Sequence, residues 1–299
     1  MTATNIQSLT TIVVLPVRDA RAFAAAEGLC FGPSADLDGY RVLAQGRAFE
    51  FTSKGSDQNA LRARLSGAGI SADICVMPSA GRKKRLLICD MDSTLIGQEC
   101  IDELADFAGV KAYVSEITER AMRGELDFEA ALKERVGLLK GLPLENLQKC
   151  YDERIALNPG ARTLARTMAK HGAKTVIVSG GFTFFSSRIA ANAGFRVHQA
   201  NVLLDDGAAL TGAVSMPILG REAKAEALRH HSETLGGASA AIAIGDGAND
   251  LAMINAAGLG IAYYAKPAVA AAAHCAIEHT DLTTALFYQG YSEDEFAQG

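Results

Sequence analysis

The feature that most constrains the fold is a short apolar run that ends abruptly in two acids one residue apart. The run Leu86-Leu87-Ile88-Cys89 is followed by Asp90-Met91-Asp92. A short, continuous apolar run is typical of a strand that is buried on both faces, as in a parallel sheet. Open parallel sheets bind ligands beyond the carboxyl ends of their strands, so we expect Asp90 and Asp92 to lie in a binding crevice.

A second apolar run, Ala240-Ala241-Ile242-Ala243-Ile244, also ends in acids, within Gly245-Asp246-Gly247-Ala248-Asn249-Asp250. If the two strands lie side by side, their four acids gather in one crevice, where their mutual repulsion requires a cation. These acids are Asp90, Asp92, Asp246 and Asp250. Carboxylates without nearby His or Cys ligands favour Mg²⁺, which commonly bridges to phosphate. The sequence therefore predicts phosphoryl chemistry.

The pattern along the chain predicts an α/β protein with an accessory domain and an insertion. Residues 1–80 are expected to follow the order βαββαβ, a split βαβ arrangement. Residues 81–299 alternate helix and strand, which predicts a doubly wound, mostly parallel sheet, with a hairpin through Asp205-Asp206-Gly207 and terminal helices after residue 263. Within this part, residues 98–156 carry helical apolar spacing and are expected to form a small helical cap over the crevice.

Composition and charge exclude several classes of function. A net charge of −5 argues against a nucleic-acid surface. The one basic cluster, Arg82–Arg85, is expected to be a solvated linker between the domains. The six cysteines lack C-x-x-C spacing and are expected to be buried thiols in a reducing compartment. Without a leader-like start or a long apolar run, we expect a cytoplasmic protein with no membrane partner.

Four motifs occur in a defined order along the chain: Asp90-Met91-Asp92-Ser93-Thr94, Ser179-Gly180-Gly181, Lys224, and Gly245-Asp246-Gly247-Ala248-Asn249-Asp250. Together they resemble the motifs of the haloacid dehalogenase superfamily, over residues 86 to about 290. The cap segment 121–136 is similar to the cap of one family in it, the phosphoserine phosphatases. The resemblance implies a Rossmann-like core and the Mg²⁺-dependent hydrolysis of O-phospho-L-serine, a small-molecule substrate, as the last step of L-serine biosynthesis.

The resemblance also implies roles for the acids. Asp90 would attack the phosphorus and form an aspartyl-phosphate, and Asp92 would protonate the departing serine oxygen and later activate water. Mg²⁺ would be held by the side chains of Asp90 and Asp246 and by the backbone carbonyl of Asp92. Asp250 would orient Lys224 or a metal-bound water from behind.

Other residues would bind the substrate, again by resemblance. The groups implied for the phosphoryl oxygens are Ser179, Gly180, Lys224 and Asn249. Arg135 would bind the substrate carboxylate and Glu99 its ammonium group. Met122 and Phe128 would form an apolar lid that excludes water. The ordinary alternatives are that Asp246 and Asp250 serve as turn and cap residues, and that Lys224, Arg135 and Glu99 are solvated helix charges.

The sequence leaves two other functions open. An aspartyl-phosphate can be intercepted by an alcohol such as homoserine, which would make the protein a phosphotransferase from phosphoserine. The N-terminal βαββαβ segment resembles ACT regulatory domains, so the chain could instead be chiefly an amino-acid-sensing protein. Because this segment lacks catalytic groups, we expect it to serve regulation or association, including a homodimer.

Overall fold

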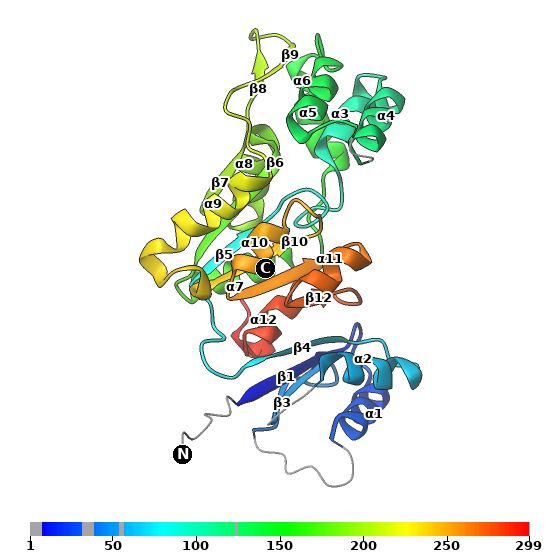
Figure 1. The fold of residues 1–299 in the computed structure, drawn as a ribbon, viewed down its shortest axis with the longest axis vertical. Helices are drawn as coiled ribbons and strands as arrows, with labels where there is room; N and C mark the ends of the chain where they lie inside the picture. Colours follow the sequence, from blue (N-terminus) through cyan, green and yellow to red (C-terminus); the bar gives the residue numbers. More distant parts are fainter. Residues whose placement is uncertain (1–7, 32–38, 54–56, 123–124, 299) are drawn as a thin grey trace.

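The structure, a computed structural model, describes residues 8–31, 39–53, 57–122 and 125–298. Three parts follow one another along its long axis in Figure 1. An N-terminal sheet with two helices lies at one end, a central sheet with helices on its faces lies in the middle, and a helical cap beside a hairpin lies at the other end.

The central sheet has six strands in the order β12-β11-β10-β5-β6-β7, and all its pairs are parallel. Its strands are β5 (Leu86–Cys89), β6 (Lys174–Phe182), β7 (Val197–Asn201), β10 (Ala241–Gly245), β11 (Leu259–Tyr263) and β12 (Cys275–Ile277). The predicted parallel sheet is confirmed. The strand β12 corrects the expectation of helices alone after residue 263, because three residues are too few to show a period in the sequence.

Helices cover both faces of this sheet. They are α7 (Ala161–Lys170), α8 (Thr183–Ala193), α9 (Arg221–Ser232), α10 (Leu251–Ala256), α11 (Pro267–Ala272) and α12 (Thr284–Tyr288), with short 3-10 helices at Glu233–Leu235, Ala238–Ala240 and Glu293–Glu295. Alternate residues of β5 serve the two faces: Ile88 packs in one apolar cluster with Leu228 of α9, and Leu87 packs in another with Leu164 of α7. Burial on both faces explains why β5 reads as a continuous apolar run.

The cap comprises α3 (Cys100–Phe107), α4 (Lys111–Met122), α5 (Phe128–Gly137) and α6 (Leu144–Arg154). The predicted hairpin is confirmed as β8 (Leu203–Asp205) and β9 (Leu210–Val214), which pair antiparallel. The hairpin is fastened to the cap, since the Gly141 amide donates to the Leu210 carbonyl and the Leu210 amide donates to the Leu142 carbonyl. The side chain of Asp127 caps α5 by accepting from the Ala130 amide.

The N-terminal sheet has the antiparallel order β2-β3-β1-β4. Its elements are β1 (Leu9–Val14), α1 (Ala20–Phe31), β2 (Arg41–Ala44), β3 (Ala48–Ser53), α2 (Gln58–Gly67) and β4 (Asp73–Pro78). Both faces of this sheet are buried. Val13 packs with Phe23 of α1, whereas its neighbours Ile12 and Val14 belong to the apolar cluster that contains Leu286 of α12. The N-terminal sheet is therefore docked on the part of the chain that carries the central sheet.

The basic segment 82–85 is a solvated linker only in part: Lys83 and Arg85 are exposed as expected, but for Arg82 and Lys84 that expectation is wrong. Arg82 forms an ion pair with Glu50 of β3, and its side chain is almost fully buried. Lys84 is also buried, with its Nζ donating to the carbonyls of Gly81 at 2.9 Å and Ser239 at 3.0 Å. Acceptors from distant parts of the chain replace water around these cations, which the local sequence gives no sign of.

All six cysteines are free thiols, and five of them are buried, as expected for small apolar side chains. Within the described ranges of the chain, no helix combines the length and apolar character that crossing a membrane requires.

Candidate active site

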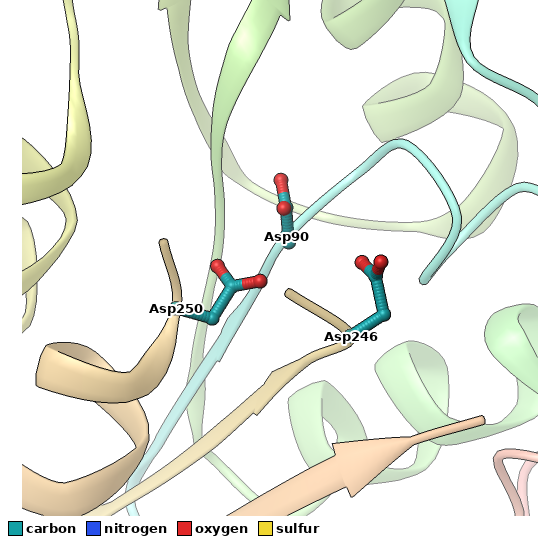
Figure 2. A group of neighbouring side chains, drawn as sticks. All are labelled: Asp90, Asp246 and Asp250. Carbon is teal, nitrogen blue, oxygen red and sulfur yellow. The ribbon is translucent and has the colours of Figure 1, made fainter. Parts of the chain in front are cut away.

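Three carboxylates meet at the carboxyl edge of the central sheet (Figure 2). Asp90 follows β5, Asp246 follows the adjacent strand β10, and Asp250 directly precedes α10. One oxygen of each lies within 4.8 Å of the others. The amide of Asp90 donates to the Ile244 carbonyl at 2.9 Å, so the pairing of the two strands itself brings the acids together.

Lys224 of α9 lies beneath this cluster and is only 1% exposed. Its Nζ donates to Asp90 and, at 2.7 Å, to Asp250 Oδ1. Burial alone would lower the pKa of Lys224, but the attraction of Asp90 and Asp250 outweighs it and raises that pKa, so the ammonium stays charged. The alternative of a solvated helix lysine is therefore excluded.

The charges of this cluster do not balance. Burial raises the pKa of Asp90 well above its ordinary range and the nearby Asp250 adds to the rise, although Lys224 opposes it. Burial and Asp250 likewise raise the pKa of Asp246 to about 6. One ammonium faces three carboxylates, and a cation added there would restore their ionisation.

The donor set fits a hard divalent cation such as Mg²⁺, because it consists of carboxylate oxygens alone. Both carboxylate oxygens of Asp250 already accept hydrogen bonds, Oδ1 from Lys224 and Oδ2 from the Gly247 amide at 3.1 Å. Asp246 accepts from the Thr94 hydroxyl at 2.9 Å through one oxygen only. The side chains best placed to hold a cation are therefore Asp90 and Asp246.

Asp92 lies beside the end of β6. Its Oδ1 accepts from the Cys100 amide at 3.2 Å. A Cβ on Gly181 would lie 2.5 Å from Asp92 Oδ2, so the close approach of these two segments requires glycine. Burial raises the pKa of Asp92 to about 7, and the charge of Glu99 adds to the rise. Its carboxyl group can thus carry a proton near neutral pH.

The end of β6 is fixed by a side chain that the sequence did not single out. Asn201, the last residue of β7, donates to the Gly180 carbonyl at 2.8 Å and accepts from the Leu219 amide at 2.7 Å. Ser179 is buried, and its Oγ accepts from the Gly181 amide at 2.9 Å. These bonds hold the Ser179-Gly180-Gly181 segment of β6 against the acids.

A cavity of about 790 Å³ lies between the cap and the sheet edge. The predicted site residues on its wall are Asp90, Asp92, Glu99, Phe128, Arg135, Ser179, Gly180, Asp246 and Asn249. Lys224 and Asp250 lie beneath this wall, behind Asp90. The side chain of Met122 lies outside the described residues.

The charged and aromatic groups that the cap contributes to the cavity include an aromatic ring, a cation and two acids, Glu99 and Asp102. The ring of Phe128 lies against Gly180, where a Cβ would come within 3.1 Å of Phe128 Cζ, so the cap and the sheet edge meet there. Glu99 accepts from the Ser93 hydroxyl at 2.6 Å. Burial lowers the pKa of Arg135, while Asp102 and Glu99 oppose this effect. Opposite charges therefore face one another across the cavity.

Residues on the cavity wall that were missed include Asp102, Thr118, Tyr264 and Lys266. Asp102 lies one turn after Glu99 on α3, and this spacing could have indicated a shared face, whereas Thr118 of α4 meets Arg135 of α5 only through the packing of the two helices. Tyr264 gives no local signal, because only the pairing of β11 with β10 brings it beside Asp246.

Comparison with known proteins gives a consistent result. Residues 87–255 match the family model for haloacid dehalogenase-like hydrolases. A phosphoserine phosphatase of Streptomyces coelicolor is 41% identical over 97% of this chain and 72% of its own length. One from Haemophilus influenzae is 48% identical over 67% of this chain, which spans 64% of that relative. The unliganded structure of a probable phosphoserine phosphatase from Vibrio cholerae superposes with a TM-score of 0.79 at 32% identity, over 96% of this chain and 88% of that one.

Proposed function

This chain belongs to the haloacid dehalogenase-like hydrolases and, within them, to the phosphoserine phosphatases; from that premise we propose that it hydrolyses O-phospho-L-serine to L-serine and phosphate through an aspartyl-phosphate on Asp90. The single observation that carries the reaction is the buried cluster of Asp90, Asp246 and Asp250 around Lys224, open to the cavity through Asp90 and Asp246. Because the proposed product is L-serine, we assign the enzyme to the closing step of L-serine biosynthesis.

In this proposal Asp90 attacks the phosphorus, and Asp92 donates a proton to the departing serine oxygen. The raised pKa of Asp92 supports the second role, since its carboxyl group must begin protonated. Asp92 then accepts a proton from the water that cleaves the aspartyl-phosphate. Ser179, Gly180 and Asn249 line the space around Asp90 and would donate hydrogen bonds to the phosphoryl oxygens.

Lys224 favours the ionised form of Asp90 and orients it from beneath, and Asp250 holds Lys224 in place. Mg²⁺, held by Asp90 and Asp246 with the Asp92 carbonyl, would supply positive charge to the transferring group. Phe128 shields the cavity from water where it meets Gly180, and Met122 is assigned the same task on the basis of sequence.

The assignment extends to the whole chain. We assign residues 1–80 to an accessory, ACT-like domain and residues 81–299 to the phosphatase, with its cap at about 98–156. The free thiols support a cytoplasmic location.

β2 is the terminal strand of its sheet, which supports a homodimer formed by pairing of β2 with β2 of a second copy. Light scattering after size-exclusion chromatography tests the homodimer.

The test is a phosphate-release screen over small phosphomonoesters with the purified chain. O-phospho-L-serine is expected to be the preferred substrate, and the screen is repeated with homoserine present. If phosphohomoserine forms in place of free phosphate, the protein is a phosphotransferase. If no phosphomonoester is turned over, the hydrolase assignment fails and the amino-acid-sensing function gains support.

Removal of Mg²⁺ is expected to abolish turnover and to lower the melting temperature. The clustered carboxylates repel one another without the cation, so binding it should stabilise the fold in proportion to its concentration. Phosphate release and thermal unfolding are measured with EDTA and after Mg²⁺ is restored. Full turnover in the chelated sample would contradict the metal assignment.

Replacing Arg135 by lysine is expected to raise KM for phosphoserine about 10- to 100-fold, because lysine loses the paired contact with the substrate carboxylate. O-phosphoethanolamine, which lacks that carboxylate, serves as the control substrate, and its KM should hardly change. An equal loss with both substrates would show that Arg135 supports the cap rather than reads the carboxylate.

A further inference from the structure

Tyr264 forms part of the active-site wall in a backbone conformation that L residues rarely adopt. It follows β11 directly, lines the cavity together with Asp246 and Asn249, and has a φ of 44°. A residue with a bulky side chain persists in the left-handed region only where its surroundings hold it there. Its amide donates to the Ile277 carbonyl at 2.8 Å, and its ring packs edge-on against Tyr263.

Ile277 is the last residue of β12, the edge strand of the central sheet. Within that sheet β12 pairs only with β11, so its other side relies on contacts from elsewhere. These contacts come from β4 of the N-terminal sheet, which lies alongside β12 near α12 (Figure 1).

The carboxylate of Asp73, in β4, accepts hydrogen bonds from the residues that follow Ile277. Asp73 accepts from three successive amides, those of Glu278 at 2.8 Å, His279 at 3.2 Å and Thr280 at 2.9 Å. It also accepts from the Thr280 hydroxyl at 2.6 Å. Asp73 is only 1% exposed, so these donors replace the water that a buried carboxylate would otherwise lose.

We propose that Asp73 is a positioning residue for the active site: by fixing residues 278–280 it holds the Ile277 carbonyl, which in turn holds Tyr264 as a substrate-contacting wall of the cavity. The N-terminal domain thereby completes the substrate pocket without contributing a residue to it. This inference rests on the proposed function, since Tyr264 would act on the binding of phosphoserine. Tyr264 has no part in the proposed chemical step, so its loss should affect KM more than kcat.

The test compares Asp73→Asn, Tyr264→Asn and the double variant. Asparagine tolerates a positive φ and so removes the ring with little backbone penalty at position 264. Each single variant is expected to raise KM for phosphoserine about three- to tenfold, the effect of losing one contact, with kcat changed less than about twofold. The double variant should be no worse than the worse single variant, because both act through Tyr264. Tyr264→Phe, which keeps the ring, should restore KM.

Arg41→Met is the matched control. It removes a hydrogen bond between the same two domains, from Arg41 to the Gly290 carbonyl at 2.6 Å, but leaves residues 277–280 untouched. Its KM should equal that of the wild type. If it raises KM as Asp73→Asn does, docking in general is responsible and the inference is overturned.

A second measurement does not depend on turnover. Hydrogen exchange at the Tyr264 amide is expected to accelerate about tenfold or more in Asp73→Asn, and not in Arg41→Met. Unchanged exchange in Asp73→Asn, or KM effects that add in the double variant, would overturn the inference.

If Asp73→Asn fails to fold, Thr280→Val removes one donor to Asp73. This variant is expected to change KM and amide exchange in the same direction as Asp73→Asn, but by less. A wild type inactive on phosphoserine would refute the proposed function, while the exchange result would still decide the positioning.

Discussion

Replacing Asp90 by asparagine is expected to abolish turnover while leaving the fold intact. An amide cannot form an acyl-phosphate, so kcat should fall by at least about ten-thousandfold, as for the loss of other catalytic nucleophiles. The fold should survive because Lys224 keeps its bond to Asp250 at 2.7 Å and one of three mutually repelling carboxylates is removed. Phosphate release and thermal unfolding measure the two effects.

Asp152→Asn, on the exposed face of α6, is the matched control and should behave as the wild type. Samples of Asp90→Asn must be checked by mass spectrometry, because deamidation of the introduced asparagine would restore the acid. Wild-type turnover in a deamidation-free sample would remove Asp90 from the role of nucleophile.

Replacing Lys224 by methionine is expected to damage both stability and activity. The substitution leaves Asp90 and Asp250 buried without their counter-ion, and breaking a buried ion pair on one side costs about 3–5 kcal/mol of unfolding free energy. Turnover should fall by about a hundredfold or more, because Asp90 loses the cation that favours its ionised form and orients it. Urea unfolding and phosphate release are measured on the same preparations.

The contrast is Lys149→Met, which breaks the exposed ion pair with Glu145 on α6. Such a pair contributes only about 0.3–0.5 kcal/mol, so the stability and activity of this variant should remain close to those of the wild type. Equal effects of the two lysine substitutions would mean that the buried cluster does not depend on Lys224.

The sequence predicted the fold well where local periodicity and burial agree. Leu86–Cys89 and Ala241–Gly245 read as buried strands and are adjacent in the sheet. The helical cap was predicted from apolar spacing alone, and the hairpin from its Asp-Asp-Gly turn. Prediction failed at β12, because an edge strand of three residues has no pattern. It also failed at Arg82 and Lys84, because buried cations are indistinguishable from solvated ones without their partners.

The candidate site likewise contains residues that the sequence could predict and residues that it could not. The acids, the glycines and Lys224 could be named from their motifs, and the parallel sheet explains why Asp90 and Asp246 meet. The sequence could not indicate that Asn201 would hold the end of β6 at Gly180 or that Tyr264 would line the cavity. Neither residue belongs to a motif, and each reaches the site through strands that are distant along the chain.

By itself, the sequence determined which chemical groups stand at the strand ends, because an apolar run followed by Asp fixes both the strand and the position of the acid. Only the tertiary structure decided the protonation of these groups and the hydrogen bonds that hold the site in place. Burial together with Asp250 and Lys224 sets the charge of Asp90, and Asp73 reaches residues 278–280 from the other end of the chain. Desolvation and long-range hydrogen bonds depend on which surfaces meet, and this information is spread over the whole chain.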